Sequence, residues 1–229
     1  MNAVTVLQLD TNFPRVPGDV GCSDTYLVPL ERLIVAGATV GRIVTHTPSE
    51  IQIEPFVQTL STASGDVVVS SCGFLSYWQR HLAARTSKPF ISSSLIALEQ
   101  LSSIYAPGEV LILTFDAQSL TAAHLGAHAD YARGIVGLPV DMHLRRVISE
   151  NQPQIDMDLV HAELTTFVAD QVRPQHRHIL LECTNLPPYK AAISASIDLP
   201  VTDILTLIEK VRPGTVKKRF LGELWTLSE

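Results

Sequence analysis

The chain has 229 residues, 46% hydrophobic and 17% charged, which is enough to bury a sizeable core and is not the composition of a disordered protein. Its formal net charge of −6 argues against a nucleic-acid or anionic-membrane partner, because both require clustered Lys and Arg. No apolar run reaches the roughly 18 residues of a membrane helix. No signal-peptide pattern appears at the start, so we expect a cytoplasmic protein. Its three cysteines are then expected to be thiols rather than a disulfide framework.

Short apolar stretches rich in β-branched residues alternate with stretches of helical spacing. In chain order, strands are expected at 4–9, 39–45, 66–70, 89–91, 110–115 and 178–181. Helices are expected at 27–36, 51–61, 75–84, 95–104, 119–128, 159–172 and 188–196. Continuous apolar strands between helices predict an α/β fold with mainly parallel sheets covered on both faces. The active site of such a fold is expected in the loops at the carboxyl ends of the strands.

Two parts of the sequence align without gaps when Cys72 is placed on Cys183. Each cysteine follows an apolar strand, and Pro89 and Pro200 stand equally far behind their cysteines. The match predicts two related lobes whose strand ends face one cleft, so that the two thiols approach a ligand from opposite sides. A racemase needs such a pair, because one group removes a proton from one face of a carbon and the other delivers a proton to the opposite face.

Cys72 stands between Ser71 and Gly73, where a strand meets a helix. Backbone N–H groups and the helix dipole at such a position lower the pKa of a thiol and can bind a carboxylate. Gly73 would let a ligand approach the backbone closely. Alone, this motif fits an inert buried cysteine equally well. The repeat favours a functional role.

Cys183 is followed by Thr184 and Asn185, which place hydrogen-bond donors beside the thiol. Capping of the next helix is the alternative role for both side chains. Pro187 and Pro188 suit the first turn of that helix, where a missing N–H is harmless.

The loop after the first strand, residues 10–21, lies at the expected active-site end. Asn12 could hold a substrate carboxylate or amine, and Arg15 is a candidate carboxylate partner. Asp19 could instead only brace the turn. Cys22 has no partner in the repeat and is interpreted as a structural thiol.

Motifs for metals and cofactors are not found in the sequence. There is no CxxC or HExxH spacing, and His124 and His128 are interpreted as surface or capping residues. There is also no GxGxxG, P-loop, PLP-lysine or GxSxG pattern. We therefore expect neither a metal nor a cofactor.

Three stretches, 15–21, 71–75 and 181–189, resemble the aspartate/glutamate/hydantoin racemase superfamily, and 113–114 and 119–125 also fit. The similarity spans nearly the whole chain. It implies two pseudo-symmetric flavodoxin-like lobes with the active site in the cleft between them, and catalysis without PLP or metal. Cys72 and Cys183 would be the acid/base pair. The substrate contacts implied by the resemblance are Asn12, Ser71, Gly73, Phe74, Thr114, Thr184 and Asn185.

The sequence departs from the racemase pattern two positions after the second cysteine. Glutamate racemases generally carry His there and aspartate racemases often carry Glu, whereas this chain has Asn185. A Cys-Thr-Asn run also occurs in the maleate isomerase and arylmalonate decarboxylase branches. The decarboxylases lack the first cysteine, so Cys72 argues against that branch, and the maleate isomerase branch stays open.

We therefore expect an isomerase, namely a cofactor-independent amino-acid racemase, with acidic amino acids as candidate substrates. The alternatives are a hydantoin racemase, a maleate-isomerase-like enzyme with a cysteine nucleophile, and a non-catalytic small-molecule-binding protein. The expected partner is a small carboxylate, and a homo-oligomer is allowed for. The expected division is one lobe of residues 1–94 plus 207–229, with a returning C-terminal helix, and a second lobe of residues 95–206.

Overall fold

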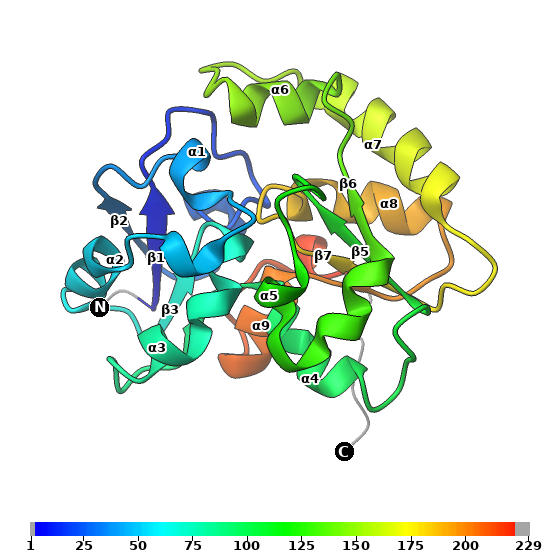
Figure 1. The fold of residues 1–229 in the computed structure, drawn as a ribbon. Helices are drawn as coiled ribbons and strands as arrows, with labels where there is room; N and C mark the ends of the chain where they lie inside the picture. The colour runs from blue at the N-terminus through cyan, green and yellow to red at the C-terminus, as the bar shows by residue number, and fades with distance from the viewer. Residues whose placement is uncertain (1–2, 223–229) are drawn as a thin grey trace.

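Two four-stranded parallel sheets organise the computed structural model, which describes residues 3–222 (Figure 1). The strands are β1 (Val4–Leu9), β2 (Leu30–Val35), β3 (Val67–Ser70), β4 (Phe90–Ile91), β5 (Val110–Thr114), β6 (Ile135–Gly137), β7 (His178–Leu181) and β8 (Val201–Thr202). The helices are α1 (Val40–Ile43), α2 (Glu54–Leu60), α3 (Gln79–Ala83), α4 (Leu98–Leu101), α5 (Ala122–Leu125), α6 (His143–Ser149), α7 (Met157–Gln171), α8 (Lys190–Ser196) and α9 (Ile204–Val211).

The two sheets have the same topology. Their strand orders are β2-β1-β3-β4 and β6-β5-β7-β8, and every pairing is parallel. Three elements of the first unit recur 111 positions later in the second: β3 as β7, α3 as α8 and β4 as β8. The expected repeat and the expected α/β class with parallel sheets are therefore confirmed.

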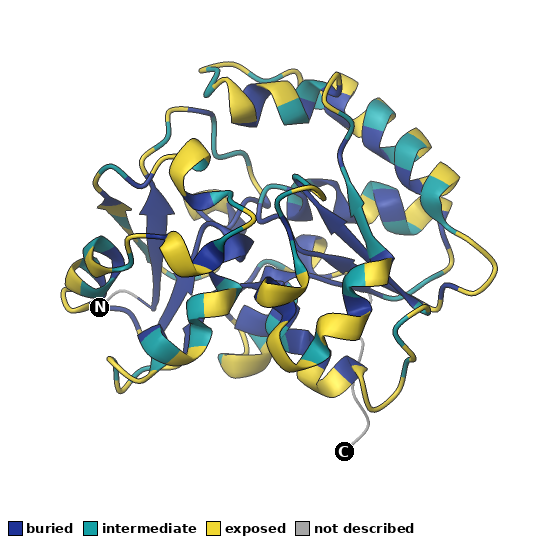
Figure 2. Ribbon diagram, in the orientation of Figure 1, coloured by how far each residue is buried: buried dark blue, intermediate teal, exposed yellow. Residues whose placement is uncertain are grey.

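The central strands are buried and mostly apolar, because both of their faces are covered. Every residue of β1, β3, β5 and β7 is buried, and Figure 2 shows these strands as the dark interior of the molecule. Alternate residues of a strand point to opposite faces. Accordingly, Val110 and Ile112 of β5 pack with the core around the first sheet, whereas Leu111 and Leu113 pack with the helices of the second.

Two expected elements near the start of the chain are wrong. The stretch 27–36 was expected to be helical, but it contains strand β2. The stretch 39–45 was expected to be a strand, but it contains helix α1. The reason lies in tertiary context: β2 is an edge strand paired only with β1, and its mixed exposure resembles the periodicity of an amphipathic helix. The elements β6, α6 and β8 were not expected, and α9 lies partly in the segment 207–229, where a returning C-terminal helix was expected.

The C-terminal helix α9 returns to the first sheet. Its residues Ile204, Leu205 and Ile208 are buried in the same core as β1 and β3, and α9 contacts β4. The expected division into lobes stays a prediction, and the outermost residues of its first lobe, 1–2 and 223–229, lie outside the described part of the chain. Within residues 3–222, no helix combines the length and the hydrophobicity that crossing a membrane would require.

Candidate functional site

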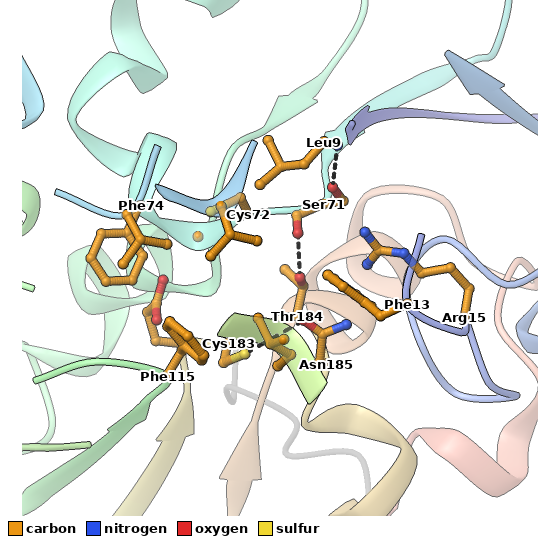
Figure 3. Close-up of a pocket in the computed structure, with 15 residues that line it drawn as sticks. Leu9, Phe13, Arg15, Ser71, Cys72, Phe74, Phe115, Cys183, Thr184 and Asn185 are labelled. Atoms are coloured by element: carbon orange, nitrogen blue, oxygen red, sulfur yellow. Dashed lines mark hydrogen bonds between the residues drawn. The ribbon is translucent and has the colours of Figure 1, made fainter. Parts of the chain in front are cut away.

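Cys72 and Cys183 occupy equivalent places in the two sheets. Cys72 follows Ser71 at the end of β3, and Cys183 follows Glu182 at the end of β7. Both are free thiols, with exposed fractions of 8% and 7%. Both line one cavity, which we call the site cavity, and Figure 3 shows their side chains on opposite sides of it. The structure thus brings the two predicted cysteines together.

The site cavity has about 370 Å³ of empty space, part of it open to solvent, and its lining is mostly apolar. Its walls come from the ends of both sheets, from α1 and α6, and from the loop after β1. The lining residues are Leu9, Phe13, Arg15, Val40, Val44, Ser71, Cys72, Gly73, Phe74, Phe115, Ile148, Glu182, Cys183, Thr184 and Asn185. Three aromatic rings and one guanidinium group therefore surround the two thiols.

Both thiols are protonated at neutral pH. Burial, followed by the nearby charge of Glu182, raises the pKa of Cys72 to about 12 and raises the pKa of Cys183 as well. The expected lowering by a helix N-terminus is therefore outweighed. Two backbone N–H groups oppose this rise in the thiol pKa. The Phe74 N–H donates to the Cys72 sulfur, and the Asn185 N–H donates to the Cys183 sulfur. Each donor lies two residues after its cysteine, so this arrangement also repeats between the lobes.

Ser71 and Thr184 join the two cysteine loops. The Thr184 hydroxyl donates to the Ser71 carbonyl over 2.6 Å, and Ser71 Oγ accepts from the Leu9 N–H at 2.9 Å. Gly73 also packs against the opposite loop, since a Cβ at this position would lie 2.7 Å from the Glu182 carbonyl oxygen. These contacts set the spacing of the two thiols.

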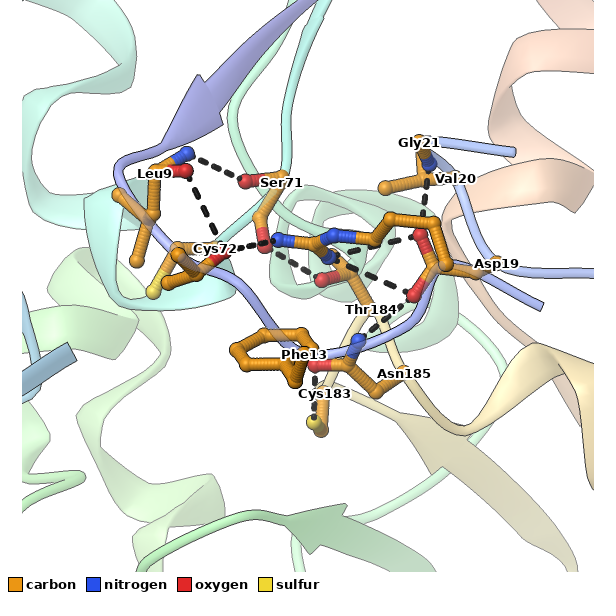
Figure 4. Close-up of polar contacts among 12 residues, drawn as sticks. Leu9, Phe13, Asp19, Val20, Gly21, Ser71, Cys72, Cys183, Thr184 and Asn185 are labelled. Atoms are coloured by element: carbon orange, nitrogen blue, oxygen red, sulfur yellow. Dashed lines mark hydrogen bonds and ion pairs between the residues drawn. The ribbon is translucent and has the colours of Figure 1, made fainter. Parts of the chain in front are cut away.

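A chain of polar contacts runs from Arg15 to Cys183, and Figure 4 shows its part from Asp19 through Asn185 to Cys183. The Arg15 guanidinium pairs with the buried Asp19 at 3.4 Å, and Asp19 accepts from Asn185 Nδ2 at 2.6 Å. Asn185 Oδ1 in turn faces the Cys183 thiol at 3.8 Å. Arg15 can donate one more hydrogen bond, because its Nε–H is buried without a partner among the described residues. Asp19 thus positions both Arg15 and Asn185.

Two predicted contact residues are not among the residues that line the site cavity. Asn12 is exposed, and its backbone N–H donates to Asn151 Oδ1 at 2.7 Å. This contact ties the loop after β1 to the segment after α6. Thr114 is fully buried, and its hydroxyl donates to Glu182 Oε2 at 2.5 Å. Substrate contact by either side chain stays a prediction.

Glu182 is a cavity residue that the sequence analysis missed. It is 1% exposed and lines the cavity beside Cys183. Burial raises its pKa to about 7, although the Thr114 hydroxyl opposes the shift. A charged residue directly after the apolar run 179–181 was the signal that could have found it. The carboxyl group can exchange its proton near neutral pH.

His124 has a structural role. His124 caps α5 through Nδ1, which accepts from the Thr121 N–H at 3.1 Å, and its ring lies edge-on to Phe74 with centroids 5.1 Å apart. Burial lowers the pKa of His124 to about 4, so it is neutral at pH 7. Within residues 3–222, no group of three His, Cys, Asp or Glu side chains is arranged to hold a metal ion.

Curated relatives of the chain are dimethylsulfoniopropionate lyases. One from Durusdinium sp. clade D is 30% identical over 214 residues, which cover 87% of this chain and 70% of the relative. Dimethylsulfoniopropionate lyase 5 of Emiliania huxleyi is 27% identical over 96% of this chain and 47% of its own length. The chain therefore spans about half to 70% of the length of these relatives. No family model matches the chain.

Solved structures with a similar fold are racemases. An allantoin racemase from Klebsiella pneumoniae superimposes with a TM-score of 0.56 and 14% identity, covering 88% of this chain and 82% of the racemase. A glutamate racemase from Bacillus anthracis gives a TM-score of 0.53 and 14% identity, covering 93% and 83%. The expected likeness to the racemase superfamily, with its two-lobed fold, is confirmed.

The expected racemase activity is wrong, although the expectation of an enzyme agrees with the relatives. Similarity at 14% identity shows only the fold, and one fold hosts many chemistries. The sequence relatives are much closer and are lyases rather than isomerases. The alternatives of a hydantoin racemase, a cis-trans isomerase and a non-catalytic binding protein are set aside for the same reason.

Proposed function

The chain belongs to the family of the dimethylsulfoniopropionate lyases, and we propose that it cleaves dimethylsulfoniopropionate, or a closely related β-sulfonio carboxylate, by elimination. The observation that carries the proposal is the pair of buried thiols facing one cavity that also contains a guanidinium group. This substrate is a small zwitterion, with a carboxylate at one end and a sulfonium two methylene groups away.

Elimination begins with the same step as racemisation, which is removal of a proton next to a carboxylate. In the proposed reaction one cysteine, as thiolate, takes a proton from the α-carbon. The electron pair of the broken C–H bond forms the C=C bond. The bond between the β-carbon and sulfur breaks, and its electron pair leaves on neutral dimethyl sulfide. The organic product is acrylate.

Arg15 is the proposed partner of the substrate carboxylate. Its unpaired Nε–H is a buried donor, and negative charge builds up on the carboxylate as the α-proton leaves. Asp19 holds the guanidinium at 3.4 Å and so keeps it in place before substrate binds. A preorganised donor of this kind is worth more in a dry, apolar cavity than in water.

An eliminating enzyme needs no proton donor on the second face of the substrate. This difference fits Asn185, which holds Asp19 and faces Cys183 in the place where racemases carry His or Glu. The two thiols also differ in their surroundings, because Arg15 acts on the pKa of Cys72 and Asp19 on that of Cys183. The two cysteines are therefore expected to have unequal roles.

The test is to incubate the purified protein with dimethylsulfoniopropionate, measuring dimethyl sulfide in the headspace and acrylate by NMR. We expect both products in equal amounts. Of Cys72→Ser and Cys183→Ser, the variant that removes the base should lose at least about 100-fold in kcat, and the other should lose less. Cys22→Ser is the matched control and should keep full activity, since Cys22 is buried outside the site cavity. Absence of dimethyl sulfide, or full activity of both active-site variants, would overturn the proposal.

A further inference from the structure

Glu182 has one carboxylate oxygen fixed and one free. Oε2 accepts the Thr114 hydroxyl at 2.5 Å, whereas Oε1 is buried without a hydrogen-bond partner among the described residues. A buried carboxylate oxygen without a donor costs free energy, and sites with such atoms are often completed by a ligand. The free oxygen lies in a residue that lines the site cavity.

The position of Glu182 is fixed by its neighbours from both lobes. Its Oε1 lies against the backbone of Gly73, where a Cβ atom would overlap it. Gly73 precedes Phe74, and Thr114 precedes Phe115, so the carboxylate lies between the segments that carry these two rings. Figure 3 shows Phe74 and Phe115 on one side of the site cavity and Arg15 on the other, with both cysteines between them.

The site cavity therefore has a cation at one end and an ionisable acid at the other. Arg15 provides the positive end, and Glu182 provides an ionisable acid at the aromatic end. Phe74 is the ring best suited to a cation, because its neighbour His124 is neutral. Phe115 already carries the Arg145 guanidinium over its ring, 3.9 Å from the centroid.

We propose that Glu182 and Phe74 bind the sulfonium end of the substrate while Arg15 binds its carboxylate. The inference rests on the proposed function and deepens it by assigning the group that selects for a cation. The α-carbon of a substrate held at both ends lies between the two cysteines. Electrostatics supports the assignment, since the carboxylate and the two thiols form a buried acidic cluster that a bound cation would stabilise.

The arrangement also has a consequence for the thiols. After burial, the charge of Glu182 is the next cause that raises the pKa of both cysteines. A sulfonium placed against the carboxylate offsets that charge and favours the thiolate, with the thiol proton released to solvent. The proton acceptor would then form in the presence of its substrate, and Glu182 acts as a substrate-binding residue rather than as the base.

Two unreactive carboxylates that differ only in charge test this proposal. 3-(Trimethylammonio)propionate carries a cation at the position of the sulfonium, and 4,4-dimethylpentanoate has the same shape with a neutral carbon there. Isothermal titration gives both affinities, with NMR to verify that the ammonium compound stays intact. We expect the wild type to bind the cation about tenfold tighter or more, and Glu182→Gln to reduce this preference to about twofold or less.

Two further variants separate a local effect from a general one. Thr114→Val keeps the carboxyl group of Glu182 but removes the hydroxyl that holds it, so the preference should fall only in part. Glu99→Gln removes an exposed glutamate near His128 and should leave the preference unchanged. Thermal melting shows whether each variant is folded, and Glu→Gln preserves the shape of the side chain.

A wild type that binds both compounds equally, or a Glu182→Gln variant that keeps the wild-type preference, would overturn the inference. Since these measurements need no turnover, they are independent of the lyase assay. Dimethyl sulfide release without a preference for the cation would refute the role of Glu182 alone. A preference without dimethyl sulfide release would refute the lyase activity alone.

Discussion

Replacement of Gly73 by Ala tests how closely the two cysteine loops must approach. The new Cβ would overlap Glu182 Oε1 and lie 2.7 Å from the Glu182 carbonyl oxygen. A side-chain oxygen can move, but the carbonyl belongs to the backbone between β7 and Cys183. Overpacking of this kind costs about 1–3 kcal/mol. At roughly 2–4 °C per kcal/mol for a chain of this size, the melting temperature should fall by about 2–12 °C.

The same substitution should also lower activity, because relief of the overlap moves the Glu182 carboxylate and separates the thiols. Urea denaturation and the dimethyl sulfide assay measure the two effects. Gly108→Ala is the matched control, since no heavy atom lies within 4 Å of a Cβ built there and the position has no left-handed backbone. If Gly73→Ala matched Gly108→Ala in stability within about 0.5 kcal/mol and kept full activity, the close approach of the loops would be refuted.

Arg15→Lys should raise KM for dimethylsulfoniopropionate by about 10- to 100-fold, the effect of losing charge-assisted hydrogen bonds, and an unchanged KM in steady-state kinetics would contradict carboxylate binding by Arg15. Thr184→Val should cost about 1–3 kcal/mol in urea denaturation because it removes the 2.6 Å bond between the lobes, and a loss below about 0.5 kcal/mol would show that this bond is dispensable. Burial raises the pKa of Glu182 from its ordinary value of 4.5 to about 7, so the stability that it contributes is complete below about pH 4.5 and is lost as the pH rises through 7. Relative to Glu182→Gln, the wild type should lose about 3 kcal/mol of unfolding free energy between pH 4 and 8, and parallel pH curves for the two proteins would contradict this.

The cysteine pair and the fold class could be predicted because their signals are local and repeated. Cys72 and Cys183 each follow a short apolar run, 67–69 and 179–181, and a gapless offset relates the segments around them. A parallel sheet covered on both faces produces such strands wherever it occurs. The edge strand β2 could not be predicted in this way, because only one neighbour and one face determine its side-chain pattern.

Contacts made through tertiary structure were beyond the sequence. Asp19 was expected only to brace a turn, yet it also accepts from Asn185, 166 positions away. Gly73 was expected to admit a ligand, yet its missing side chain makes room for Glu182. Thr184 was expected to contact the substrate, yet its hydroxyl donates to Ser71 in the other lobe. Each of these roles depends on a partner that the local motif does not contain.

The type of reaction, racemisation or elimination, was the hardest part to predict. Racemases and eliminating enzymes both remove a proton next to a carboxylate, so the same cysteine motifs serve both. The branches differ in whether the substrate carries a leaving group on its β-carbon. The residue most closely connected with that leaving group is Glu182, a buried carboxyl group at the far end of the site cavity from Arg15. Its role becomes visible only in the folded protein, where Gly73 and Thr114 surround its carboxyl group.

Turnover of dimethylsulfoniopropionate that carries two deuterium atoms on its α-carbon tests the proposed elimination most directly. Elimination through a cysteine base predicts one equivalent of dimethyl sulfide and acrylate that retains one deuterium at C2, with a primary isotope effect on kcat/KM if proton removal limits the rate. Formation of 3-hydroxypropionate with both deuterium atoms retained would show displacement by water instead. That product, or the absence of any turnover, would contradict the account.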